Sequence, residues 1–194
     1  LGQISDLTIY AGQALTMGSG GLLMANLTSS GSGWTSIPAV TLDPPTGGGD
    51  TATVQPVMGV LSENTRVNPT SSGLGYQSAP LVILTDSGGT GSGAQARAYL
   101  YNEVDPTMSP TNPNYGKIQY LQILDPGTGY TGPVSVTLTG GGFVTPAAFA
   151  NLELNLQQLN VVDPGSGYSA IPNITFSGGG GTGAQGTEIG RAHV

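Results

Sequence analysis

The stretch Pro164–Ala184 reads Pro-Gly-Ser-Gly-Tyr, then Ser-Ala-Ile-Pro, then Asn-Ile-Thr-Phe-Ser, and ends in Gly-Gly-Gly-Gly-Thr-Gly-Ala. The same order of features occurs four times in the chain: Gly-x-Gly-aromatic, a proline, an alternating apolar segment and a glycine run. A period of about 40 residues with a constant internal order indicates a tandem array of one supersecondary unit. The shared positions are Gly31, Gly33, Trp34 and Pro38; Gly73, Gly75, Tyr76 and Pro80; Gly127, Gly129, Tyr130 and Pro133; and Gly165, Gly167, Tyr168 and Pro172.

Each copy predicts three short β-strands. The first is an apolar run such as 118–124, and it is followed by a turn such as Asp125-Pro126-Gly127. The second is the segment after the proline, in which every second residue is apolar, so that one face is buried. The third is rich in small residues, as in 94–99. No stretch shows a helical stripe of apolar residues. The predicted fold is therefore all-β: an elongated tandem array of about four three-stranded repeats.

The copies divide the chain into a series of segments. We expect a lead-in at 1–20 with a strand at Leu7–Tyr10, followed by repeats at 21–65, 66–101, 117–154 and 155–187. An insertion at 102–116 separates the second and third copies. Loops of this length often carry function, and Tyr101 and Tyr115 flank this one as a candidate ligand surface. The alternative interpretation is a flexible junction between two pairs of repeats.

The last seven residues, 188–194, break the repeat abruptly. They are the translation of a common short-read sequencing adapter, gag-atc-gga-aga-gca-cac-gtc. We expect them to be an artefact of sequencing rather than part of the natural repeat, with the true end of the protein missing. The alternative is a genuine but frayed terminus.

Composition excludes several classes of partner. The net charge is −7 and the basic residues before the tail are Arg66, Arg97 and Lys117, so a phosphate-binding patch and a nucleic-acid partner are not expected. No apolar run approaches the ~20 residues that a membrane span needs. There is no cysteine, so disulfides cannot stabilise units this small. Stability must come from contacts between units or chains, and we expect a homo-oligomer or filament.

Catalytic chemistry finds little support in the chain. The only histidine is His193, in the adapter-like tail, so Ser-His-Asp and Cys-His arrangements are not expected. The segment Gly127–Gly132 matches G-x-G-x-x-G but precedes Pro133 and a second strand, where a dinucleotide site needs a helix. Asp125 and Asp163 form an acid/base pair only if they meet in a cleft; their position before Pro-Gly favours turn caps. We expect no enzyme activity and no cofactor.

Metal and sugar sites are the remaining alternatives. A surface calcium ion would have to use aspartates such as Asp43, Asp50 or Asp86, but no D-x-D-x-D-G loop is present. The aromatic residue of each copy either forms part of an exposed ladder for sugar stacking or covers the glycines beside it. The second interpretation is favoured, because strands without large side chains need a ring to complete their core.

The pattern read from Pro164 to Ala184 resembles a glycine-rich β-repeat of tail-fibre, baseplate and other virion structural proteins of bacteriophages, and of bacterial extracellular fibres and adhesins. The resemblance covers about 21–187, and it is closest in copy four and loosest in copy one. Copy three departs from it through Pro133 and through Phe143–Pro146, which interrupt its glycine run. The resemblance implies an extended, trimeric or filamentous structural element that is extracellular or part of a virion. The alternative function is a glycan- or receptor-binding adhesin module.

Overall fold

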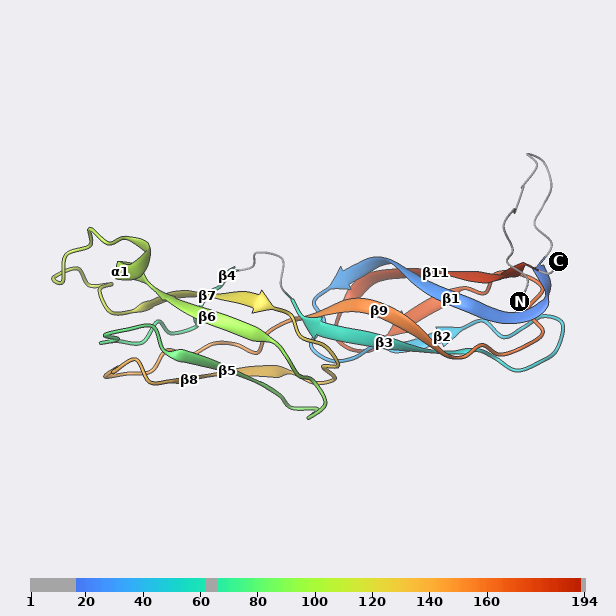
Figure 1. Ribbon diagram of the computed structural model, residues 1–194, viewed down its shortest axis with the longest axis horizontal. Coiled ribbons are helices and arrows are strands. Elements are labelled where there is room, and N and C mark those ends of the chain that lie inside the picture. Colours follow the sequence, from blue (N-terminus) through green and yellow to red (C-terminus); the bar gives the residue numbers. More distant parts are fainter. Residues whose placement is uncertain (1–16, 62–65, 193–194) are drawn as a thin grey trace, which may run out of the picture.

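The computed structural model describes residues 17–61 and 66–192, and these form an elongated molecule built almost entirely from β-strands (Figure 1). The all-β prediction is confirmed. The strand predicted at 7–10 lies outside the described residues. The strands are β1 (Met17–Ser32), β2 (Ala39–Leu42), β3 (Thr53–Val60), β4 (Arg66–Val67), β5 (Leu81–Asp86), β6 (Gln95–Leu100), β7 (Ile118–Asp125), β8 (Val134–Thr139), β9 (Leu154–Asp163), β10 (Ile174–Ser177) and β11 (Thr182–Ala192); one helical turn, α1 (Tyr101–Val104), follows β6.

Most strand pairs join two different copies of the repeat. Strands of copy one pair with strands of copy four, in the antiparallel ladders β1–β11, β3–β9 and β2–β10. Strands of copy two pair with strands of copy three, in the antiparallel ladders β6–β7, β5–β8 and β4–β7. In both cases the first strand of one copy lies against the third segment of its partner, and the two second strands pair with each other. We call the resulting bodies the 1–4 lobe and the 2–3 lobe.

A single copy is therefore not an independent three-stranded sheet, and the predicted array of four such units is not what the pairing shows. The sheets are small: three have two strands, and one has five in the order β4-β7-β6-β5-β8. The third segment of copy three, at 147–150, is equivalent to the strand predicted at 94–99, but it forms only the isolated bridge Ser71–Ala148, beside a second bridge at Leu74–Thr145. Small-residue segments of this kind bury too little apolar surface to hold a sheet within one copy, and a partner copy must cover them.

The repeat aromatics provide that cover reciprocally. Trp34, Tyr76, Tyr130 and Tyr168 are between 1 and 3% exposed. A Cβ added to Gly181 of copy four would overlap the Trp34 ring of copy one, and a Cβ added to Gly91 of copy two would overlap the Tyr130 ring of copy three. Only glycine permits this approach of backbone to ring. Burial confirms the covering role of these rings, and the alternative of an exposed sugar-stacking ladder is wrong.

The hydroxyls of the three tyrosines add hydrogen bonds between the paired copies. Each accepts a hydrogen bond from the backbone N–H of an alanine in the partner copy: Ala147 to Tyr76 at 2.8 Å, Ala94 to Tyr130 at 3.2 Å and Ala52 to Tyr168 at 2.9 Å. Trp34 has no acceptor, and its indole N–H donates instead to the Ser30 carbonyl at 2.8 Å. The two copies of each lobe are thus joined by side chain to backbone bonds as well as by strand ladders.

A recurring pair of backbone bonds holds three of the Gly-x-Gly-aromatic loops, and we call it the two-bond clamp. Where the lobes meet, Val60 N–H donates to Pro126 O at 2.8 Å and Tyr130 N–H donates to Met58 O at 3.2 Å. Equivalent bonds occur at one end of the molecule, where Leu22 N–H donates to Pro164 O and Tyr168 N–H donates to Gly20 O. They occur again at the other end, where Ile118 N–H donates to Ser72 O and Tyr76 N–H donates to Gly116 O. The larger apolar core runs through both lobes, since it contains Trp34 and Tyr168 as well as Ile123 and Val134.

Candidate binding surface at the end of the 2–3 lobe

The insertion lies at the outer end of the 2–3 lobe (Figure 1). It joins β6 to β7, which are neighbours in the same sheet, so it reverses the chain at the end of the molecule. The interpretation as a junction between two pairs of repeats is wrong, because copies two and three form a single pair and the lobes are connected elsewhere, after β3 and before β9.

The insertion is built from consecutive turns. Its two ends are tied together by Tyr101 N–H donating to Lys117 O at 3.1 Å and by Gly116 N–H donating to the Asn102 side-chain Oδ1 at 3.0 Å. Two polar side chains cap turns within it, Asp105 towards Thr107 and Asn112 towards Asn114. Such local side chain to backbone bonds explain why the segment, although rich in proline, is ordered without a sheet.

The structure places the two predicted ligand residues at opposite ends of this insertion. Tyr101 is half-buried at the start of α1, and Tyr115 is 38% exposed. The close ring pairs within 17–61 and 66–192 are Tyr76–Phe143 and Tyr99–Tyr120, so Tyr101 and Tyr115 do not stack on each other.

Sequence reasoning missed a stack of side chains across the adjacent sheet. The rings of Tyr99 on β6 and Tyr120 on β7 lie 4.9 Å apart and nearly parallel, at 18°. Arg97 lies over the Tyr99 ring at 4.4 Å, and Arg66 lies over the Tyr120 ring at 4.5 Å. The alternation Arg97-x-Tyr99 was the available signal, because residues two apart on a strand share a face. The partner ring on β7 could be known only from the register.

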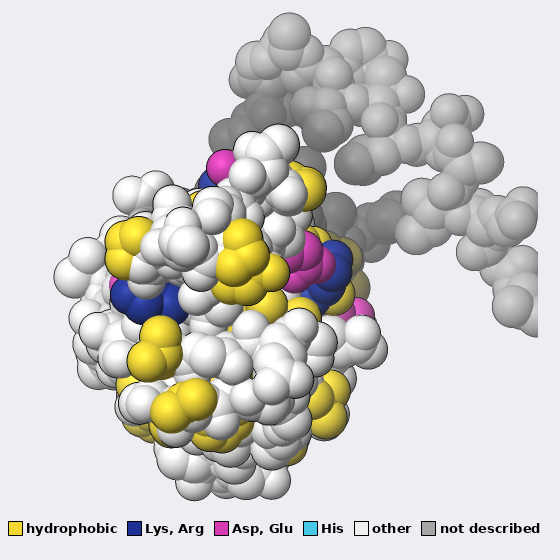
Figure 2. Space-filling view, turned by 90° about the vertical axis from the view of Figure 1, so that its left-hand side faces the viewer, with side chains coloured by type: hydrophobic (Ala, Val, Ile, Leu, Met, Phe, Trp, Pro, Cys, Tyr) yellow, Lys and Arg dark blue, Asp and Glu magenta, His cyan; other side chains and the backbone are white. Residues whose placement is uncertain are grey.

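Beside this stack lies an open depression of about 540 Å³. It is lined by Arg97 and Leu100 from β6, by Asn102 and Glu103 from α1, and by the loop that follows Tyr76 (Gln77, Ser78 and Ala79). Arg97 and Glu103 form an ion pair there, with side chains 48% and 32% exposed. Figure 2 views this end of the molecule and shows basic and acidic side chains next to each other, with hydrophobic side chains beside them.

The aspartates considered for acid/base catalysis cap turns instead. Asp125 Oδ1 accepts from Gly127 N–H at 2.8 Å, and Asp163 Oδ1 accepts from Gly165 N–H at 2.9 Å. Each carboxylate is exposed at the end of its own strand, β7 or β9, and the two do not share a cleft. Among the described residues no group of three His, Asp or Glu side chains is placed to hold a metal ion.

Asp86 has a structural environment unlike that of the other aspartates. It is 9% exposed, and its carboxylate accepts hydrogen bonds from five backbone N–H groups. Burial raises the pKa of this carboxyl. The hydrogen bonds from the N–H groups of Gly91, Gly88, Gly132 and Thr131 together lower the pKa by more than burial raises it, so the pKa lies below its ordinary value. The side chain ties the glycine run of copy two to the loop after Tyr130 in copy three, and this use fully occupies it.

The opposite case is Glu188, the first residue of the adapter-like tail. β11 continues through it, and Glu188 is paired with Ala25 of β1. Both carboxylate oxygens are buried without a hydrogen-bond partner among the described residues, and burial raises the pKa of this group. An unpaired buried carboxylate destabilises a fold, so Glu188 opposes the pairing of β11 with β1.

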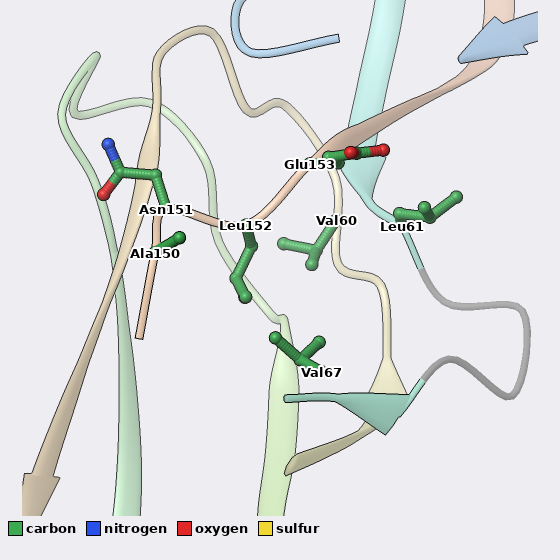
Figure 3. A pocket seen from close by; sticks show the side chains of 7 residues that line it. All are labelled: Val60, Leu61, Val67, Ala150, Asn151, Leu152 and Glu153. Carbon is green, nitrogen blue, oxygen red and sulfur yellow. The ribbon is translucent and has the colours of Figure 1, made fainter. Parts of the chain in front are cut away.

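A second pocket, beside the point where the lobes meet, is less suited to a polar ligand. It measures about 240 Å³, and Val60, Val67 and Leu152 point towards one another across it (Figure 3). The polar groups of Asn151 and Glu153 point away from these three side chains. The pocket therefore offers an apolar lining without converging hydrogen-bonding groups.

Comparison with protein-family models, with curated proteins and with solved structures finds no match for this chain. No helix in the described part of the chain is long and apolar enough to cross a membrane.

Proposed function

We propose that this chain is a non-enzymatic structural module of an extracellular fibre or filament, of the kind that the resemblance to phage tail-fibre and virion repeats implies. The observation that supports this proposal is the reciprocal pairing of copies one with four and two with three, which arranges two similar lobes along one long axis (Figure 1). In this form, the four repeats are an array of pairs rather than of single units.

The two-bond clamp supports the same role. It joins the lobes to each other, and it occurs again at both ends of the molecule, with Gly20–Leu22 at one end and Gly116–Ile118 at the other. A connection that is reused between different segments is suited to a rod built from similar parts. Such rods act through length and rigidity, without a catalytic pocket.

Self-association is the second element of the proposal. Large apolar side chains are exposed on both lobes, including Leu81 at 66%, Val144 at 78%, Val162 at 62% and Ile171 at 64%. Charged residues make up only 8% of the chain, so few charged side chains lose their hydration when two copies come into contact. Exposed strand edges add unpaired backbone groups that favour pairing with another chain. We propose a homo-oligomer or filament.

Electron microscopy of the purified chain, with light scattering for its mass, tests this proposal. We expect filaments or one defined oligomer. Val144→Glu and Ile171→Glu should shift the mass towards the monomer, whereas the same change at exposed Ser109 should not. A monodisperse monomer over a wide range of concentration would contradict self-assembly.

A second candidate function is adhesion through the insertion. The insertion projects at the end of an elongated molecule, and Tyr115 on it is 38% exposed, as a ring that contacts a glycan must be. We propose that, in this case, Tyr101 and Tyr115 contact a surface glycan or receptor. Binding to a glycan array that Tyr115→Ala abolishes would support this role, and no binding across a broad array would contradict it.

A further inference from the structure

The depression between β6, α1 and the loop at 77–79 contains a set of hydrogen-bonding groups that keep free donors or acceptors after their contacts within the fold are made. We propose that it binds one residue of a neutral hexose glycan. This inference rests on the adhesion role proposed above, but it moves the contact from Tyr101 and Tyr115 to Arg97, Glu103, Asn102, Gln77 and Ser78.

Arg97 is held in place before any ligand arrives. Its guanidinium lies 4.4 Å from the centre of the Tyr99 ring, and its Nη1 donates to the Tyr99 hydroxyl at 3.1 Å. Tyr99 is in turn held by the parallel ring of Tyr120. A long side chain that is already immobilised loses less conformational entropy when it binds, which favours affinity.

Glu103 is oriented by two contacts. One carboxylate oxygen forms the ion pair with Arg97, and the other accepts from the Leu100 backbone N–H at 3.5 Å. Each carboxylate oxygen can accept more than one hydrogen bond, so both oxygens keep acceptor capacity towards the depression. Asn102 uses its Oδ1 to hold Gly116, which leaves the amide Nδ2 as its donor.

Paired hydroxyl groups are the ligand chemistry that matches these side chains. A carboxylate beside a guanidinium offers an acceptor and a donor next to each other, and two neighbouring sugar hydroxyls use both, since each hydroxyl can donate and accept. The amides of Gln77 and Asn102 and the hydroxyl of Ser78 add further groups of both kinds. The depression, about 540 Å³, falls in the range of roughly 300–1,000 Å³ found for small-molecule sites.

The charges favour a neutral ligand. Glu103 lies beside Arg97 and the chain has a net charge of −7, so an acidic sugar would meet a neutralised guanidinium and a repulsive field. A flat nucleobase is disfavoured as well, because the Tyr99 ring already contacts Arg97 and stacks on Tyr120. Hydrogen bonds, with the buried Leu100 and the small Ala79 as an apolar base, are what remains for recognition.

Saturation-transfer NMR on the full chain tests the proposal, with methyl glucoside, galactoside and mannoside as neutral probes and methyl glucuronide as the acidic one. We expect at least one neutral glycoside to bind with a Kd of about 1 mM, typical of a single small ligand held by few contacts. Glu103→Gln should weaken binding about tenfold, because it replaces charge-assisted hydrogen bonds by neutral ones. Ser78→Ala, at an exposed side chain, should weaken it about threefold without affecting the fold.

Asn114→Ala is the matched control, since Asn114 is an exposed residue of the insertion that does not line the depression; its Kd should stay within about twofold of the original. Circular dichroism checks that Glu103→Gln is folded, and Ser78→Ala decides the result if it is not. Binding that both variants leave unchanged, tighter binding of the glucuronide, or no binding of any neutral probe would overturn the proposal. Loss of binding in Tyr115→Ala alone would overturn the proposed site in the depression but would support adhesion through the insertion. None of these results bears on the filament role, which electron microscopy tests separately.

Discussion

Replacing Asp86 by asparagine should be among the most destabilising changes of a single atom in this chain. Asparagine has the same shape, but it presents one oxygen instead of two. Oδ2 of Asp86 accepts from Thr90, Gly91 and Thr131, and Oδ1 accepts from Gly88 and Gly132. If the asparagine oxygen takes the position with three donors, its NH₂ group faces the other two N–H groups and both bonds are lost.

The expected magnitude follows from those two bonds. A hydrogen bond to a charged group contributes about 1.5–3 kcal/mol, so the loss amounts to about 3–6 kcal/mol. Gly88 is exposed and water can replace its bond, whereas Gly132 is buried and its N–H would remain unpaired. We therefore expect Asp86→Asn to lower the free energy of unfolding by about 3 kcal/mol at pH 7.

The pH dependence makes this test specific to the carboxylate. The pKa of Asp86 is lowered in the folded state, so its contribution to stability is present above the unfolded pKa of about 3.9 and is lost as the pH falls through the folded value. Below that value the wild-type side chain is protonated and resembles asparagine. The difference in stability between wild type and Asp86→Asn should therefore be constant above about pH 5 and should shrink at lower pH.

Urea unfolding, followed by circular dichroism and by the fluorescence of the buried Trp34, measures both quantities. Asp163→Asn is the control, because Asp163 is exposed and accepts one backbone bond, which asparagine can also accept; its effect should stay below about 0.5 kcal/mol. An Asp86→Asn protein within about 0.5 kcal/mol of wild type at pH 7 would refute the reasoning, as would a difference that does not change with pH.

Three further changes can be tested by the same unfolding assay. Tyr168→Phe removes the acceptor of the Ala52 N–H, which is buried, and should lower stability by about 1–3 kcal/mol; no change would show that water replaces the hydroxyl. Gly127→Ala should lower stability by more than about 3 kcal/mol, because φ is +59° and the new Cβ would overlap the backbone of copy two. Gly89→Ala, at φ +76° but in open space, should lower it by only about 1–2 kcal/mol, and equal effects of the two variants would contradict the overlap. Glu188→Gln should stabilise the chain at neutral pH, since burial raises the pKa of Glu188 and its charged form opposes folding above the unfolded pKa of about 4.3. This gain in stability should disappear in acid, and a loss of stability at pH 7 would contradict the prediction.

The strand content of this fold was readable from local patterns, because alternation and turn residues are local properties. The segment 81–86 alternates and becomes β5, and the Asp-Pro-Gly turns cap the ends of β7 and β9 through Asp125 and Asp163. The covering role of Trp34 and the three tyrosines also followed from local composition, since glycine-rich segments need a ring to fill their core.

The partner of each copy was not readable in this way. Nothing in copy one indicates that its Ala52 will meet Tyr168 rather than Tyr76, because all four copies have nearly the same pattern. The partnership depends on chain reversal at 102–116, which brings copy three back against copy two and leaves copy four for copy one. The depression beside Arg97 was missed for a related reason: its walls come from 77–79 and 97–103, which lie side by side only because β5 pairs with β6 within copy two.

The nested partnership has a consequence for how the chain is made. Copies two and three are neighbours in the sequence, so they can pair as soon as copy three has left the ribosome. Copy one must wait for β11, its partner strand, which is synthesised only after copies two and three. Folding should then begin with copies two and three, with the glycine-rich segments of copy one uncovered until copy four has been synthesised. In that interval, copy four of a neighbouring nascent chain is an equally good partner, so the rate of synthesis itself becomes a factor in whether one chain closes alone or two chains interlock.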